Sequence, residues 1–152
     1  MRYSEEDKKD ILRKVVRLVV NAATRTKPGF APDIIIEPAL TKANELIEKC
    51  QNEPDDFDIW RNGRLDLYTS HIARNMIMQN YDEYRLTEEN IEAVNALIEA
   101  EEMLGDKVSD AELADLFDYT PEELARLRIL IKYLNGIDRE KAYAEFVKKY
   151  EL

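Results

Sequence analysis

The chain has 152 residues, of which 45% are hydrophobic and 36% are charged, and its formal net charge at pH 7 is −10. A chain of this length can bury one good core or two small helical cores, with no surplus for a third. Apolar runs stay well short of a membrane-spanning helix, and residues 1–6 lack the apolar core of a signal peptide. We therefore expect a soluble, cytoplasmic protein with no membrane partner.

Composition also favours helices over strands. Only four glycines are present, the five prolines lie mostly between periodic segments, and strand-like alternation is rare. We expect an all-α protein, a helical bundle followed by a helix-turn-helix-type helical subdomain. The expected divisions are residues 1–82, residues 83–134 and a C-terminal helix in residues 135–152. The single cysteine, Cys50, permits no internal disulfide, and we expect it to be reduced and partly buried on a helix.

The first two predicted helices occupy the N-terminal third. Ser4 and Asp7 begin the first helix with a capping box, its apolar residues recur every three or four positions, and it ends near residues 26–29. The second begins at about Asp33 and carries Leu40 among its apolar residues. Pro38 would bend this helix if it starts at Asp33.

A polar connection, residues 51–56, leads to two aromatic residues, Phe57 and Trp60, which we expect to anchor the loop on the core. The aspartates around them resemble metal ligands. The glycine and the terminal glutamate of a calcium loop are missing, so we interpret these acids as solvated loop residues and expect no metal site.

The third predicted helix follows Gly63, with Leu67 and Ile72 among its expected core positions. This helix combines basic side chains with aromatic and other hydrogen-bonding side chains. Such a mixture can stack on exposed bases and pair with them, or it can simply solvate the outer face of a core helix, and both interpretations stay open. The residues concerned are Arg61, Arg64, Tyr68, His71, Arg74 and Asn75.

Three further helix starts follow. Thr87 caps a helix that we expect to continue through Met103, on its apolar side, to Gly105. Then come two starts one short turn apart, residues 109–112 and residues 120–123, the second with Pro at its first helical position. This is a helix-turn-helix pattern, which is typical of nucleic-acid-binding proteins and also of ordinary helical hairpins. Asp118, in the turn, can adopt the left-handed conformation that such a turn needs.

Negative charge is concentrated in the second half of the chain. Residues 1–76 are neutral overall, whereas residues 82–123 hold fifteen acidic side chains against two basic ones. This field repels phosphates within a Debye length of about 8 Å. On the second helix of the pattern, Arg128 and Lys132 are one turn apart and remain candidates for weak, salt-sensitive DNA contacts. A last helix begins after a cap at residues 135–138.

The order of these segments resembles the second and third conserved regions of bacterial sigma factors, which direct RNA polymerase core to promoters. Residues 12–23 resemble the helix that opens the second region. Residues 33–37 with Leu40 resemble its core-binding helix. Residues 57–75 are similar to its promoter-melting helix, with Ile72-Ala73-Arg74-Asn75 as a good local match, and residues 86–130 resemble the third region.

This resemblance implies a non-enzymatic transcription protein without a cofactor. It implies RNA polymerase core binding by Asp33, Ile34, Glu37, Leu40 and Asn44. It also implies promoter DNA binding, weak for the protein alone, by Arg61, Arg64, Tyr68, His71, Arg74 and Asn75, with Arg128 and Lys132 in the third region. We expect no counterpart of the fourth sigma region in residues 135–152.

Two other interpretations remain. The chain could be an acidic helical interaction protein, such as a phage or mobile-element regulator, whose residues 82–123 bind a basic partner or imitate nucleic acid. It could also be a structural adaptor without DNA binding, its helix-turn-helix pattern being only a packed hairpin. Glycine-rich phosphate loops, zinc ligand clusters and a nucleophile elbow are not found in the sequence. The oligomeric state stays open.

Overall fold

The computed structural model describes residues 2–52, 58–60, 63–105 and 107–152. These described residues form helices and no strand, which confirms the all-α prediction. In chain order the elements are α1 (Glu5–Arg25), α2 (Asp33–Asn52), α3 (Arg64–Gln79), α4 (Tyr81–Tyr84), α5 (Glu88–Leu104), α6 (Asp110–Phe117), α7 (Pro121–Leu130), the 3₁₀ turn η2 (Ile131–Tyr133) and α8 (Arg139–Lys149).

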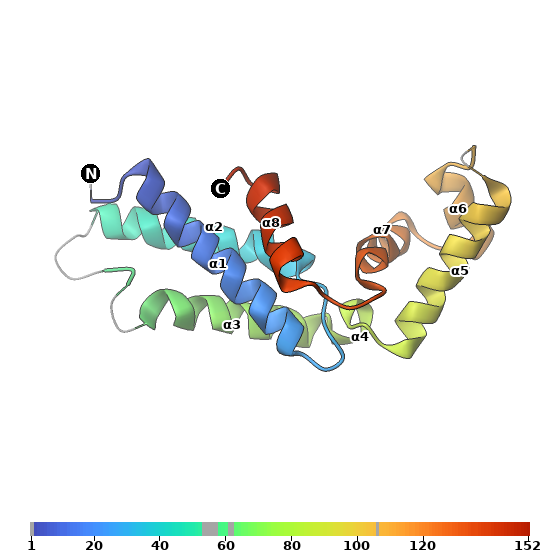
Figure 1. Cartoon of the computed structure of the whole chain (residues 1–152), viewed down its shortest axis with the longest axis horizontal. Coiled ribbons are helices and arrows are strands. Elements are labelled where there is room, and N and C mark those ends of the chain that lie inside the picture. Colours follow the sequence, from blue (N-terminus) through green and yellow to red (C-terminus); the bar gives the residue numbers. More distant parts are fainter. Residues whose placement is uncertain (1, 53–57, 61–62, 106) are drawn as a thin grey trace.

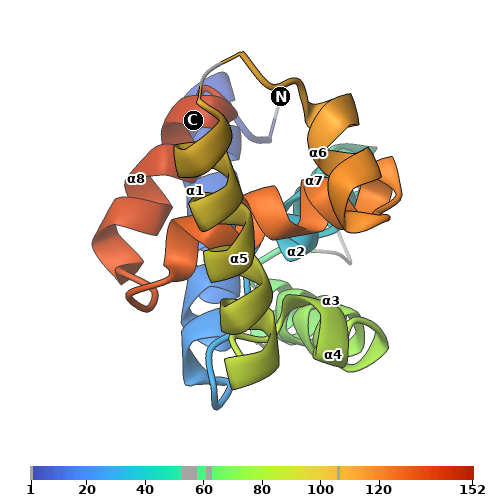
Figure 2. The ribbon, with the colours of Figure 1, turned by 90° about the vertical axis from the view of Figure 1, so that its right-hand side faces the viewer.

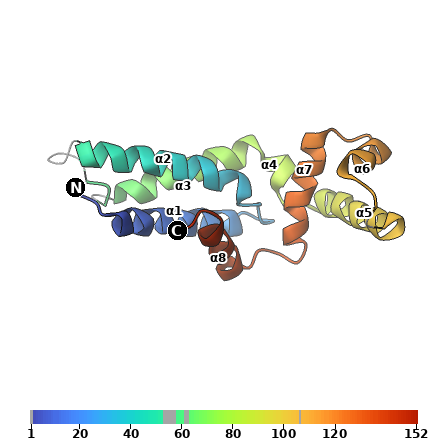
Figure 3. The same cartoon turned by 90° about the horizontal axis from the view of Figure 1, so that it is seen from above.

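The helices form two lobes along one long axis (Figures 1 and 3). The larger lobe contains α1, α2, α3 and α8, with α1 in contact with the other three. The smaller lobe contains α5, α6 and α7, and α4 lies between the lobes. Each lobe has its own buried apolar cluster, and Tyr84 and Ile137 pack against both. Although α8 follows the smaller lobe in sequence, its Ala142 and Phe146 are buried in the larger core.

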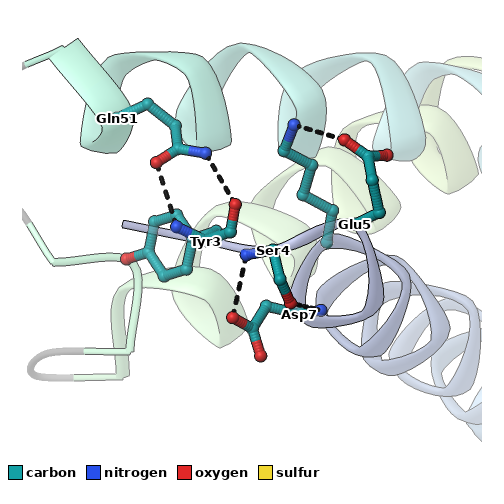
Figure 4. A network of polar contacts seen from close by, with 6 residues as sticks. Tyr3, Ser4, Glu5, Asp7 and Gln51 are labelled. Carbon is teal, nitrogen blue, oxygen red and sulfur yellow. Dashed lines mark hydrogen bonds and ion pairs between the residues drawn. The ribbon is translucent and has the colours of Figure 1, made fainter. Parts of the chain in front are cut away.

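The predicted first helix is confirmed, with six buried residues along one side of α1. Its start is a reciprocal capping box (Figure 4): the Asp7 amide donates to Ser4 Oγ at 3.0 Å, and the Ser4 amide donates to Asp7 Oδ2 at 2.9 Å. The side-chain amide of Gln51 binds both the N–H and the C=O of Tyr3, each at 3.0 Å. The N-terminal segment is thereby tied to the end of α2.

Pro38 lies inside α2, which nevertheless runs as one helix from Asp33 to Asn52. Proline has no N–H to donate to the carbonyl four residues earlier, so the ladder lacks one bond at Ile34. Cys50, near the end of this helix, is free and fully buried.

Three apolar positions differ from the sequence prediction. Trp60 is 49% exposed and Ile59 is buried instead, while Phe57 lies outside the described residues. Leu67 is 70% exposed, because the buried side of α3 passes through Leu65, Thr69 and Ala73. Met103 is 86% exposed: at 3.6 residues per turn, it lies on the opposite side of α5 from the buried Val94.

The predicted pair of helices around residue 118 is present as α6 and α7. The Glu112 amide donates to the Ser109 hydroxyl at 3.2 Å, and Thr120 and Glu123 form both halves of a capping box. Asp118 ends α6 in the left-handed conformation at φ 58°. This conformation turns the chain between the two helices.

Backbone hydrogen bonds join the lobes. Phe30 forms an isolated antiparallel bridge with Arg85, the Leu86 amide donates to the Gly29 carbonyl at 2.7 Å, and the Ala31 amide donates to the Tyr84 carbonyl at 2.9 Å. The start of α2 is therefore held beside the smaller lobe. This placement decides the environment of Asp33, the first of the residues predicted to bind RNA polymerase.

Candidate functional site

The residues predicted to bind RNA polymerase lie in three different environments on α2. Glu37 and Asn44 are exposed, and Ile34 is half-buried. Leu40 is 7% exposed and belongs to the core of the larger lobe. Asp33 has a side chain only 13% exposed. The structure therefore offers Glu37, Asn44 and part of Ile34 to a partner, while Leu40 supports the helix from behind.

Asp33 is occupied by contacts with the smaller lobe. Its carboxylate accepts a hydrogen bond from the Tyr133 hydroxyl at 2.5 Å and forms an ion pair with Lys132. Burial and the negative charge of Asp33 raise the pKa of Tyr133 well above its usual value. Tyr133 therefore stays neutral and keeps donating to Asp33 at physiological pH.

A groove of about 860 Å³ runs along the exposed side of α2. One side comes from α2, and the other comes from the end of α7, from η2 and from the end of α8. Its residues are Asp33, Ile34, Glu37, Pro38, Thr41, Lys42, Glu45, Ile129, Lys132, Lys149 and Tyr150. Burial, followed by the charges of Glu37 and Asp33, raises the pKa of Tyr150, which is consistent with α8 ending close to α2.

The DNA-binding candidates on α3 gather on its outer face. Tyr68, His71, Arg74 and Asn75 are exposed, and at 100° per residue they lie within about 120° around the helix axis, opposite the buried residues. Arg64 is half-buried at the start of the same helix, and Arg61 lies outside the described residues. The Lys42 ammonium of α2 lies 5.6 Å from the centre of the Tyr68 ring.

Two apolar residues complete this face and were not among the sequence candidates. Leu67 is 70% exposed and Met78 is 67% exposed, both on the outer side of α3. The face therefore mixes apolar, aromatic, basic and amide side chains, which suits contact with bases as well as with phosphates. A helical-wheel projection of the sequence, started at Arg64, would have placed both residues on the same face as the other candidates.

The cations of α7 and η2 bind acids or polar groups within the chain. Arg128 forms ion pairs with Glu101 and with Asp110, the latter at 2.8 Å. Burial lowers the pKa of Arg128, but its hydrogen bonds with these carboxylates outweigh burial and raise it. Lys132 is paired with Asp33. Arg128 and Lys132 would have to exchange these partners for phosphates in order to bind DNA.

Acidic side chains cover much of the smaller lobe. Figure 2 shows the ribbon of this lobe from its outer end. These side chains lie on α5, on α6, in the turn after α6 and in the first turn of α7. The exposed acids are Glu88, Glu89, Glu92, Glu99, Glu102, Asp110, Glu112, Asp115, Asp118, Glu122 and Glu123. Met103, Leu104 and Leu116 are exposed among them.

Within the described residues, no cluster of three or more histidine, cysteine or carboxylate side chains is arranged to hold a metal ion. None of the helices in that part of the chain combines the length and apolarity needed to cross a bilayer. Comparisons of the chain with models of protein families, with curated proteins and with solved structures find no match.

Proposed function

We propose that the protein is a sigma-like transcription factor that binds RNA polymerase core through the exposed side of α2 and DNA through the outer face of α3. The observation that carries the proposal is the composition of the α3 face, where Tyr68, His71, Arg74 and Asn75 are exposed together. The exposed side of α2, with Glu37 and Asn44, supplies a second and separate surface.

The proposed action is strand capture without covalent chemistry. Stacking of one base on an aromatic ring such as Tyr68 contributes about 1–3 kcal/mol and tolerates any base. The Arg74 guanidinium attracts phosphates, and the Asn75 amide can donate to and accept from a base edge. A single-stranded segment suits this face better than a duplex, because its bases are free to stack.

Electrostatics make polymerase necessary for tight DNA binding. The acidic surface of the smaller lobe repels phosphates, and Arg128 and Lys132 are already paired with acids. Among the described residues, the smaller lobe leaves few cations for phosphates, so the protein alone should bind DNA weakly and with strong salt dependence. Bound to polymerase core, the α3 face would be held beside DNA that the enzyme already grips.

The first experiment measures binding of the purified protein to bacterial RNA polymerase core by co-elution and by affinity at physiological salt. The proposal expects binding that competes with a known sigma factor. Absence of binding at micromolar concentrations would refute it.

The second experiment tests the DNA surface in the polymerase complex. We expect the double variant Arg74→Ala/Asn75→Ala to capture single-stranded promoter DNA at least about tenfold more weakly, as loss of one phosphate contact and one base contact implies. Arg139→Ala/Asn95→Ala is the matched control, because it removes an exposed arginine and an exposed asparagine on α8 and α5. Equal DNA capture by both double variants would reject the α3 face as the DNA surface.

A second candidate function is an acidic interaction protein, favoured by the concentration of exposed carboxylates on the smaller lobe. Such a surface fits a basic partner or imitates nucleic acid. This candidate expects that neither polymerase core nor single-stranded DNA binds, so the same two experiments discriminate between the candidates.

A further inference from the structure

Tyr81, the first residue of α4, carries an exposed aromatic ring beside the proposed DNA surface. Tyr81 is 37% exposed, and only two residues separate it from Met78, which is 67% exposed near the end of α3. Figures 1 and 3 show α4 following α3 along the long axis of the molecule, before the smaller lobe begins. A DNA strand that leaves the outer face of α3 toward the smaller lobe would therefore meet α4 next.

The Tyr81 ring is held in place by Arg85. The Arg85 guanidinium lies over the ring, 3.9 Å from its centre, in a cation–π contact. The backbone of Arg85 is itself fixed, because it forms the antiparallel bridge with Phe30 and its carbonyl accepts a hydrogen bond from the Asn90 side-chain amide at 2.7 Å. The ring is therefore preorganised, with a cation over one face and another part of its surface open to solvent.

The positive charge of Arg85 is not neutralised by an ion pair. None of the ion pairs among the described residues includes Arg85, whereas the cations of α7 and η2 are paired with acids. The two acids of α4, Asp82 and Glu83, follow Tyr81 directly. At 100° per residue they lie about 100° and 160° away from Tyr81 around the helix axis, while Arg85 lies about 40° away. The ring and the cation thus share one side of α4, and the acids lie on others.

Packing within the protein does not account for the Tyr81 ring. In the part of the chain that the structure describes, Tyr81 belongs to neither apolar cluster. A second arginine–tyrosine stack shows the contrast: Arg17 lies 3.9 Å from the centre of the Tyr143 ring, but Tyr143 packs against the larger core and Arg17 donates to Glu140 at 2.8 Å. That stack fastens α8 to α1, whereas the stack on α4 faces solvent.

We propose that Tyr81, backed by Arg85, is a second stacking platform for the single-stranded DNA that the α3 face captures. Tyr68 lies near the start of α3, and Tyr81 follows its end. An unpaired base stacks on the open part of the ring, and the positive charge of Arg85 attracts the neighbouring phosphates. This inference rests on the proposed function and extends it, because residues 76–85 lie between the segments that resemble sigma factors and the resemblance gives them no DNA contact.

The test measures capture of single-stranded promoter DNA by full-length variants in complex with RNA polymerase core, with core alone as the background. Tyr81→Ala removes the ring, and Tyr81→Leu keeps apolar bulk without a ring, so both should weaken capture at least about fivefold. Tyr81→Trp keeps a stacking ring and should stay within about twofold. Tyr143→Ala is the matched control, because it removes the tyrosine of the other stack. Far-ultraviolet circular dichroism and core affinity verify that each variant is folded.

Duplex DNA of the same sequence is the second ligand, because its paired bases are not free to stack on the ring. Fivefold or greater losses in Tyr81→Ala and Tyr81→Leu that are confined to single-stranded DNA, with less than about twofold change in Tyr81→Trp and Tyr143→Ala, would support the platform. An equal loss for duplex DNA, or an equal loss in Tyr143→Ala, would overturn it.

The α3 variant separates this inference from the proposed function. If Arg74→Ala/Asn75→Ala weakens capture while Tyr81→Ala leaves it unchanged, the stacking platform is rejected and the proposed function survives. If the unaltered protein does not bind core at all, the proposed function fails and this inference fails with it.

Discussion

The contact between Asp33 and Tyr133 should be the strongest polar link between the two lobes. Tyr133 is 6% exposed and donates its hydroxyl to Asp33 at 2.5 Å. A hydrogen bond to a charged acceptor contributes about 1.5–3 kcal/mol, and we expect Tyr133→Phe to lower the free energy of unfolding by about 2 kcal/mol. The aromatic ring stays, so no cavity forms.

Replacing the acceptor should cost more than replacing the donor. Asp33→Ala removes the same hydrogen bond and leaves the buried Tyr133 hydroxyl without this acceptor. It also removes the ion pair with Lys132, whose side chain is 44% exposed, so that pair contributes at most about 1 kcal/mol. Loss of an acid from the first turn of α2 adds about 0.3–1 kcal/mol. The expected total is about 3–4 kcal/mol.

A double-mutant cycle isolates the link. Urea unfolding followed by far-ultraviolet circular dichroism gives the free energy of unfolding for the unaltered protein, the two single variants and the double variant. The expected coupling energy is about 2 kcal/mol. Tyr119→Phe is the control, because Tyr119 is half-buried and stacked on Phe117 at 5.4 Å, and it should change stability by less than about 0.5 kcal/mol. A coupling energy below about 0.5 kcal/mol would refute the reasoning.

The same link gives a pH dependence whose sign follows from the pKa of Tyr133. In the unfolded chain this tyrosine ionises near its usual pKa of about 10, whereas burial and the charge of Asp33 raise its pKa in the folded protein. The stabilisation is therefore complete below pH of about 10 and declines above it, by up to about 1.4 kcal/mol per pH unit. Because Tyr133→Phe lacks this component, its stability should approach that of the unaltered protein above pH of about 10. If the difference in unfolding free energy between the two proteins stayed constant above pH of about 10, the link between Tyr133 and Asp33 would be contradicted.

Three further changes test other parts of the fold. Phe30→Ala should destabilise by about 3–5 kcal/mol, seen as a lower urea midpoint, because the ring is fully buried beside the junction of the lobes; a loss below about 1 kcal/mol would contradict that packing. Asp118→Val should cost about 1–2 kcal/mol in the same assay and Asp118→Gly almost nothing, because φ is 58°; equal effects would count against a left-handed turn. Cys50 is fully buried and burial raises the pKa of its thiol, so a thiol reagent should label it far more slowly in the native protein than in urea; equal rates would show that the site opens freely.

Helix starts were predictable from the sequence because they depend on neighbours within one turn. Ser4, Thr87, Ser109, Thr120 and Asp138 each cap a helix, as their spacing to the following residues predicted. The buried side of α1 was predictable for the same reason, since apolar residues three and four positions apart must share a face.

The sequence predicted less well which side of each helix faces the core. The α3 candidates share one face because they are spaced by helical periodicity, and the exposed Arg74 and Asn75 follow that rule. Hydrophobicity alone predicts Leu67, Trp60 and Met103 in the core, but all three are exposed. An apolar side chain is buried only where a neighbouring element covers it, and the sequence around it does not say where that element lies.

The sequence by itself determined the all-α class, the capped helix starts and the residues that share a helix face, because these follow from interactions over one or two turns. Only the tertiary structure decided that α8 returns to α1, that Tyr133 meets Asp33 across 100 positions, and that Lys149 and Glu37 line the same groove. These contacts join segments far apart in the chain, and they arise because both lobes must bury their apolar faces at once. A pattern confined to one segment carries no signal for that shared burial.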